Sequence, residues 1–223
     1  MNDIVTQLFN SPGWKAVERM GSLASMHHIF SQNYSDLNIL IIKIQNDRNV
    51  SQEIYQEAQQ HLDQYVFNFL SSPMALVDNC RSIMSYYNNT ILYQEYQEKV
   101  NQKFLKCPLH SFIKQFRNFQ THFRLCPISS IRVGEGKEWK TVLFCEDLLK
   151  YPNQWNILAK QYIEKCGQEI NIKDAFSEYN NLIDNFYHWL YGKLKEFHKD
   201  EILERNRLIE ETGINIPGLV FKI

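Results

Sequence analysis

The 223-residue sequence predicts a mainly helical protein that carries one small β-hairpin. Glycine and proline are scarce, at eight and six residues, so long segments run without a chain breaker. Several of these segments place apolar residues three or four positions apart, which is the spacing of one helix face. The segment 128–145 instead has two β-rich runs around a glycine-containing turn, which favours a hairpin.

The first half of the chain predicts two helices and one ambiguous segment. A helix is predicted over 12–30, after Ser11-Pro12-Gly13. Residues 37–45, LNILIIKIQ, are rich in isoleucine and favour either a strand or a buried helical turn. The strongest helical pattern covers 51–88, where we expect a kink or a break before Pro73.

Two further helices lie on either side of a proline break in the middle of the chain. The first covers about 91–105 and ends at Cys107-Pro108. The second covers 109–123, where four phenylalanines form a single stripe that we expect to face the core: Phe112, Phe116, Phe119 and Phe123.

After the hairpin, apolar spacing predicts helices over about 153–166 and 173–200. Gly167 is a suitable stop for the first, and residues 201–210 extend the second. The last residues, from Gly213, read as an irregular or extended tail. We therefore expect one domain over 1–223, with the hairpin of 128–145 as an insertion.

Charge and cysteine content narrow the function classes. The net charge is −1, so the molecule as a whole is not a polyanion-binding protein, and any nucleic-acid contact must come from a local patch. Five widely spaced cysteines without a C-x-x-C pair predict reduced thiols in a cytoplasmic protein. The N-terminus lacks the pattern of a signal peptide, and the apolar run 37–44 is shorter than the roughly 20 residues of a membrane helix, so we expect no membrane association.

A local patch of this kind is suggested by one tract. Between Lys99 and Gly134 there is no aspartate or glutamate, but there are seven basic residues and two histidines: Lys99, Lys103, Lys106, Lys114, Arg117, Arg124, Arg132, His110 and His122. Such a tract predicts a phosphate-binding face. The alternative is that acidic side chains from other segments cover it in the folded protein.

The motif FRNFQTHF, residues 116–123, lies inside this tract. On a helix, Arg117 falls about 130° to one side of the phenylalanine stripe and His122 about 90° to the other. Within one helix, Arg117 and His122 therefore point apart and are poorly placed to act together on one substrate. In two copies that meet across a two-fold axis, these side chains can face a shared cleft. The alternative, which spacing alone favours, is a surface arginine and a half-buried histidine.

The motif Arg117-Asn118-x-x-x-His122 resembles the R-x4–6-H motif of the HEPN superfamily. The preceding segment YVFNFLSSPMALVDNCRSIMSYY (65–87) and the segment HSFIKQFRNFQTHFRLCP (110–127) resemble bacterial HEPN-like proteins, and the resemblance covers about 65–127. It implies a helical bundle that forms a homodimer with both motifs at the interface.

The resemblance further implies a metal-independent endoribonuclease, acting as a toxin or defence effector with an antitoxin or another protein as partner. His122 would be the general acid and base, and Arg117 would hold the scissile phosphate. Asn118 would orient His122 or the phosphate. Lys103, Lys106, Lys114 and Arg124 would bind the RNA backbone. Some members of the superfamily are inactive, so the alternative is a non-catalytic module that binds RNA or protein.

No cofactor or metal is expected from the sequence. His27-His28, His61 and the cysteines are metal-ligating residue types, but only Cys107-x-x-His110 has zinc-site spacing, and it lacks a second half. Phosphate-binding glycine loops and the common hydrolase motifs do not occur.

Overall fold

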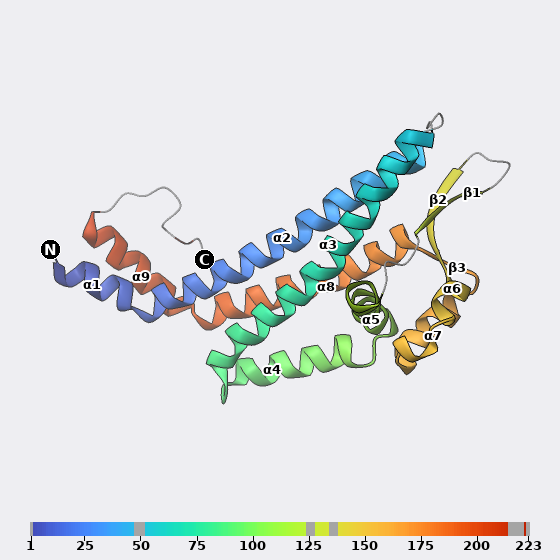
Figure 1. Ribbon diagram of the computed structural model, residues 1–223. Helices are drawn as coiled ribbons and strands as arrows, with labels where there is room; N and C mark the ends of the chain where they lie inside the picture. The colour runs from blue at the N-terminus through green and yellow to red at the C-terminus, as the bar shows by residue number, and fades with distance from the viewer. Residues whose placement is uncertain (1, 47–51, 124–127, 134–137, 214–220, 222–223) are drawn as a thin grey trace.

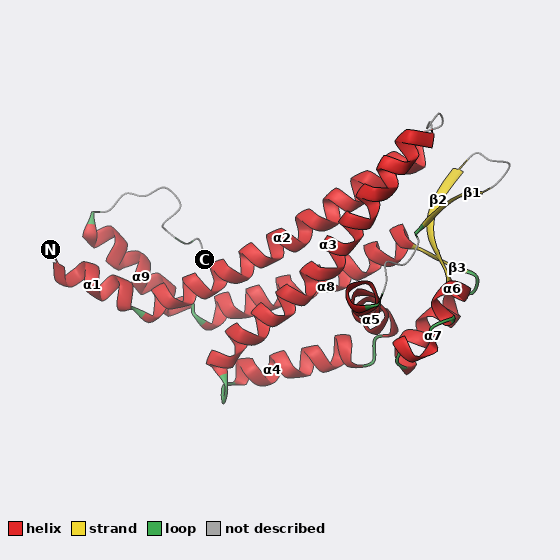
Figure 2. Ribbon diagram, in the orientation of Figure 1, coloured by secondary structure: helices red, strands yellow, loops and turns green. Residues whose placement is uncertain are grey.

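A computed structural model describes residues 2–46, 52–123, 128–133, 138–213 and 221 of the chain. In this part of the chain the protein is mainly helical and has a small antiparallel sheet, which confirms the predicted class (Figures 1 and 2). The larger helices are α1 (Asn2–Asn10), α2 (Pro12–Asn46), α3 (Gln52–Met84), α4 (Ile91–Val100), α5 (Pro108–His122), α7 (Ile157–Cys166), α8 (Ile172–Phe197) and α9 (Lys199–Thr212).

The two longest helices, α2 and α3, lie side by side and antiparallel along the upper edge of the molecule in Figure 1. The ambiguous segment 37–45 belongs to α2, so the strand alternative is wrong. Leu37, Ile41 and Ile44 are buried at helical spacing, whereas Ile39 is exposed. Burial of one face against α3 therefore decides the conformation of this isoleucine-rich run over its strand propensity.

Helix α3 continues through Pro73, so of the two predicted alternatives, a kink or a break, the break is wrong. A proline inside a helix has no N–H for the carbonyl four residues earlier, which here is that of Phe69. The buried Ser72 hydroxyl donates to the Phe69 carbonyl oxygen at 3.0 Å and replaces the lost donor. A short 3₁₀ turn, Ser85–Tyr87, then ends the helix.

The middle of the chain follows the prediction closely. Thr90 caps α4, because its hydroxyl oxygen accepts the Tyr93 N–H at 3.2 Å, and a π-helical turn, Asn101–Leu105, follows α4. Phe112, Phe116 and Phe119 on α5 are buried, as expected of the phenylalanine stripe. Phe123 is the exception, because it is the C-cap residue of α5 and remains 48% exposed.

The two predicted β-rich runs form β1 (Ser129–Val133) and β2 (Glu138–Phe144), which pair antiparallel with Ser129 opposite Val142. The predicted glycine-containing turn between them, 134–137, lies outside the described residues. A third strand, β3 (Glu169–Asn171), which the sequence did not predict, pairs antiparallel with β2. Strand β2 is therefore central in the sheet and also packs against α2 and α8. The hairpin thus contacts the helical core through β2.

The C-terminal half contains two short helical elements that the sequence did not predict, α6 (Cys145–Leu149) and a 3₁₀ turn (Pro152–Gln154). Gly167 ends α7 with a positive φ of 79°, as its position predicts. The predicted extension of the last helix instead forms a separate helix, α9, because the chain leaves helical geometry at His198.

Most buried apolar side chains form one cluster shared by α2, α3, α4, α5, α7, α8 and the sheet. A smaller cluster joins α1 to α9 through Leu8, Leu208 and Ile209, at the end of the molecule that carries the N-terminus in Figure 1. No helix in the described part of the chain has the length and apolar character needed to cross a membrane.

Candidate functional site

The motif helix α5 has a well-defined beginning. Pro108 occupies its first turn, where a missing N–H costs nothing, and the Cys107 Sγ accepts the N–H of His110 at 3.5 Å. The Cys107-x-x-His110 pair is thus a helix cap, and its thiol is engaged with the backbone. The Ser111 hydroxyl donates to the Asn156 side chain at 2.7 Å and fixes α5 against the start of α7.

Arg117 and Asn118 are both half-buried on α5 and lie against each other. The Arg117 guanidinium donates to the Asn118 amide oxygen at 3.3 Å. The Arg117 Nε atom is buried without a hydrogen-bond partner, and no carboxylate of the described residues pairs with this guanidinium. A guanidinium that pairs with no carboxylate among the described residues is available to bind an oxyanion.

His122 is the last residue of α5 and its side chain is exposed, so the half-buried alternative for this histidine is wrong. It lies five positions after Arg117, which corresponds to about 140° around the helix axis. Within the described residues, neither Arg117 nor Asn118 hydrogen-bonds to His122. One copy of the chain thus brings Arg117 and Asn118 together and leaves His122 apart.

The predicted RNA-binding lysines lie on the surface near this helix. Lys103, Lys106 and Lys114 are exposed and form no ion pair with any described residue. Arg124 lies outside the described residues. At the start of the acid-free tract, Lys99 lies 5.3 Å from the Trp189 ring and shares a surface pocket with acidic residues of α4, so acidic groups reach the tract there.

His110 does not belong to the basic surface. Its Nδ1 lies 3.2 Å from the hydroxyl of the buried Tyr179, and its ring lines a cavity of about 70 Å³ between α3, α4 and α8. Burial, with smaller contributions from the charges of Lys114 and Arg81, lowers the pKa of His110 to about 4. This histidine is therefore uncharged at neutral pH.

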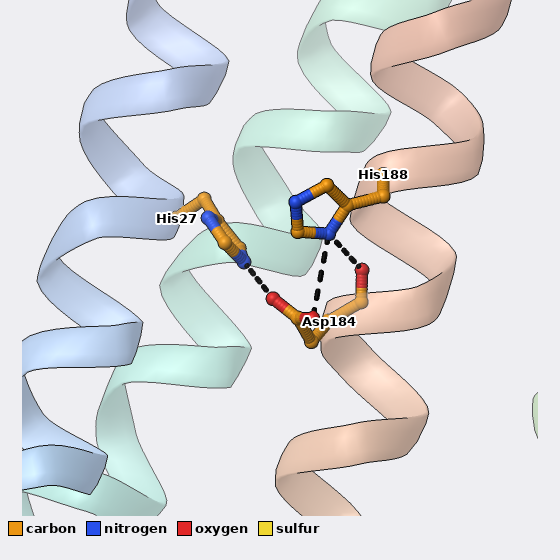
Figure 3. A group of neighbouring side chains, drawn as sticks. All are labelled: His27, Asp184 and His188. Atoms are coloured by element: carbon orange, nitrogen blue, oxygen red, sulfur yellow. Dashed lines mark hydrogen bonds and ion pairs between the residues drawn. The ribbon is translucent and has the colours of Figure 1, made fainter.

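A second cluster of polar groups, which the sequence did not predict, joins α2 to α8. His27 of α2 and Asp184 and His188 of α8 point toward one another (Figure 3). The His27 Nε2 lies 2.8 Å from the Asp184 Oδ1, and the His188 Nδ1 lies 3.4 Å from the Asp184 Oδ2. Burial lowers the pKa of His27, although the Asp184 carboxylate opposes this shift.

The sequence held only part of the signal for this cluster. Histidine, as in His27-His28, is a common metal ligand. Asp184 and His188 are four positions apart, a spacing that places two side chains on the same face of a helix. However, 157 positions separate His27 from Asp184, so only the packing of α2 against α8 joins them.

Comparison of the chain with protein-family models, with curated proteins and with solved structures found no match. The HEPN resemblance therefore remains a prediction that rests on the residues of the motif and its surroundings.

Proposed function

We propose that this chain is a metal-independent endoribonuclease that acts as a homodimer through Arg117, Asn118 and His122. The observation that carries the proposal is the Arg117 guanidinium, which Asn118 holds at 3.3 Å and which no described carboxylate neutralises. Such a guanidinium can form two parallel hydrogen bonds to a phosphate (bidentate binding) without first breaking an ion pair. The exposed Lys103, Lys106 and Lys114 supply cationic contacts for an RNA backbone.

In the proposed reaction the 2′-hydroxyl of RNA attacks the adjacent phosphorus. A histidine accepts the proton of the 2′-hydroxyl, and a protonated histidine donates a proton to the departing 5′-oxygen. The products are a 2′,3′-cyclic phosphate and a 5′-hydroxyl. Arg117 binds the non-bridging oxygens, where negative charge increases in the transition state.

A second copy of the chain is part of the proposal, because Arg117 and His122 lie on different sides of α5. When two α5 helices meet across a two-fold axis, the His122 of one copy can face the Arg117 of the other. The biological role that fits such an enzyme is a cytoplasmic toxin or defence effector, restrained by an antitoxin or another protein partner.

The test compares wild type with Arg117→Ala and His122→Ala on structured RNA in the presence of EDTA. We expect each substitution to lower the cleavage rate by at least about 100-fold. His61→Ala, on the exposed side of α3, is the matched histidine control and should cleave at the wild-type rate. Wild-type cleavage no faster than that of the two folded active-site variants would contradict the proposal.

Mixing the two inactive variants tests the shared cleft. A mixed dimer of Arg117→Ala and His122→Ala contains one cleft with both groups intact and one cleft with neither. Random exchange of copies should then restore about a quarter of the wild-type rate. No recovery after exchange, with mixed dimers demonstrated by mass spectrometry, would rule out a cleft built from two copies.

A non-catalytic module that binds RNA or protein is the second candidate. Its support is the exposed apolar surface at the two ends of α5, where Leu105 is 64% and Phe123 is 48% exposed. In this case His122→Ala would bind its partner like wild type, whereas Leu105→Ser would weaken a protein complex.

A further inference from the structure

The cluster of His27, Asp184 and His188 has the composition of a transition-metal site. Imidazole nitrogen and carboxylate oxygen are the ligand types that Zn²⁺ takes alongside thiolate. The ligating atoms of these three residues all lie within 4.8 Å of one another. Ligands bound at about 2.0–2.1 Å to a tetrahedral ion stand about 3.3 Å apart, so only small side-chain rotations would bring these atoms to one ion.

The helices hold the three side chains in convergent positions. Asp184 and His188 are four residues apart on α8 and share one face of that helix, which faces His27 on α2 (Figure 3). The His27 ring stacks on Tyr187, with ring centres 3.6 Å apart and planes inclined by only 3°. This stacking fixes the plane in which the His27 Nε2 points at the carboxylate.

Access from solvent is provided on the His188 side. The His27 side chain is 14% exposed, whereas those of Asp184 and His188 are 41% and 65% exposed. An ion can thus reach the cluster without opening the core. Three protein ligands leave at least one position of a four-coordinate ion for water or another small ligand, as in catalytic zinc sites.

We propose that His27 Nε2, His188 Nδ1 and the Asp184 carboxylate bind one divalent transition-metal ion of the Zn²⁺ class, linking α2 to α8. On binding, the ligating nitrogen of each imidazole carries no proton: a neutral ring holds its single proton on the other nitrogen, and a protonated ring releases one proton to solvent and becomes neutral. His188 also exchanges its 2.9 Å hydrogen bond to the Asp184 carbonyl for the metal bond. The site is independent of the proposed nuclease, which needs no metal.

The competing explanation is that the Asp184 carboxylate simply accepts hydrogen bonds from both histidines. This explanation predicts no affinity for metal above that of the remaining surface. The two explanations therefore differ in one measurable quantity, the stoichiometric binding of an ion by the intact, untagged protein.

The experiment titrates Zn²⁺ into metal-free protein by calorimetry and Co²⁺ by absorption spectroscopy. We expect one ion per chain, the visible absorption bands of a protein-ligated Co²⁺, and no comparable binding of Mg²⁺, which prefers oxygen ligands. Zn²⁺ in excess should also raise the thermal unfolding midpoint by several degrees, because the ion binds the folded chain preferentially.

The variants are His27→Gln, Asp184→Asn and His188→Gln, with His28→Gln as the matched control. His28 is the exposed neighbour of His27 on α2. Each ligand substitution should weaken Zn²⁺ binding by at least about tenfold, and the control should bind like wild type. His188 is exposed enough that its substitution leaves the core intact, so its result stands even if another variant unfolds.

Failure to bind one Zn²⁺ per chain would overturn the proposal, as would unchanged affinity in His188→Gln. Loss of binding in His28→Gln would overturn this set of ligands. RNA cleavage is assayed separately in EDTA, so the outcome here and the outcome for the nuclease are independent of each other.

Discussion

His110 illustrates how position in the fold changes the chemistry of a single side chain. Its ring packs near those of Phe104 and Tyr179, with centroids 5.0 Å and 5.9 Å away. In the sequence it belongs to a tract of basic residues, yet burial keeps it neutral and removes it from any phosphate-binding surface. The same burial links this residue to the stability of the protein.

We expect His110 to make the free energy of unfolding depend on pH between about 6.5 and 4. The pKa of this imidazole falls from its ordinary value of 6.5 to about 4 in the folded protein. In that window the unfolded chain binds more protons, so stability increases as the pH rises and decreases as the pH falls. Acidification from neutral pH to below 4 should therefore cost the folded state up to about 3 kcal/mol.

Urea denaturation at several pH values checks this expectation. Replacing His110 with Gln should flatten the dependence of the unfolding free energy on pH between 4 and 6.5. Equal slopes for wild type and His110→Gln would show that His110 is not the responsible group.

At the scale of the element, α3 shows how a helix accommodates a proline. The sequence predicts an interruption at Pro73, because the residue lacks a donor for the Phe69 carbonyl. The neighbouring Ser72 hydroxyl supplies this donor. The helix therefore passes continuously beneath α2, and the apolar face that both helices bury is not interrupted.

A double-mutant cycle measures this local compensation. Ser72→Ala should cost about 1–2 kcal/mol, because it leaves a buried carbonyl without a partner. In a Pro73→Ala background the backbone N–H of residue 73 can donate to Phe69, so the same substitution should cost much less. Additive effects in chemical denaturation would argue that the Ser72 hydroxyl does not replace the missing donor.

The motif helix shows how far an element can be predicted. The phenylalanine spacing correctly gave the helix and its buried face over Phe112, Phe116 and Phe119. The same spacing did not predict that Phe123 is exposed, because the helix ends one residue before it, at His122. Nor did it give the Arg117–Asn118 contact, since neighbouring residues on a helix meet only when their side chains adopt particular rotamers.

At the scale of the whole molecule, the approach of α2 to α9 depends on one glycine. Gly13 is buried in the first turn of α2, and the carbonyl oxygen of Glu201 on α9 occupies the place where a Cβ atom would stand. Any side chain here must push the two helices apart. The smaller apolar cluster of Leu8, Leu208 and Ile209 lies in the same part of the molecule.

We expect Gly13→Ala to lower the free energy of unfolding by about 1–3 kcal/mol through this overpacking. The matched control is Gly21→Ala on the same helix, where no atom lies within 4 Å of the added methyl group. That control should increase stability by about 0.5–1 kcal/mol, because alanine is the better helix former. Thermal or urea denaturation of both variants checks that the two substitutions change stability in opposite directions. Equal changes in stability would contradict the close approach of α2 and α9 at Gly13.

The sequence by itself determined the mainly helical class, the hairpin and the helix α5, because apolar periodicity and chain breakers act within a few residues. Only the tertiary structure decided that His110 is buried, that β3 completes the sheet and that His27 meets Asp184 and His188. The physical reason is distance along the chain. Local spacing sets which face a helix buries, whereas the side chains that meet across that face come from distant segments, 69 positions apart for His110 and Tyr179 and 157 for His27 and Asp184, and only packing brings them together.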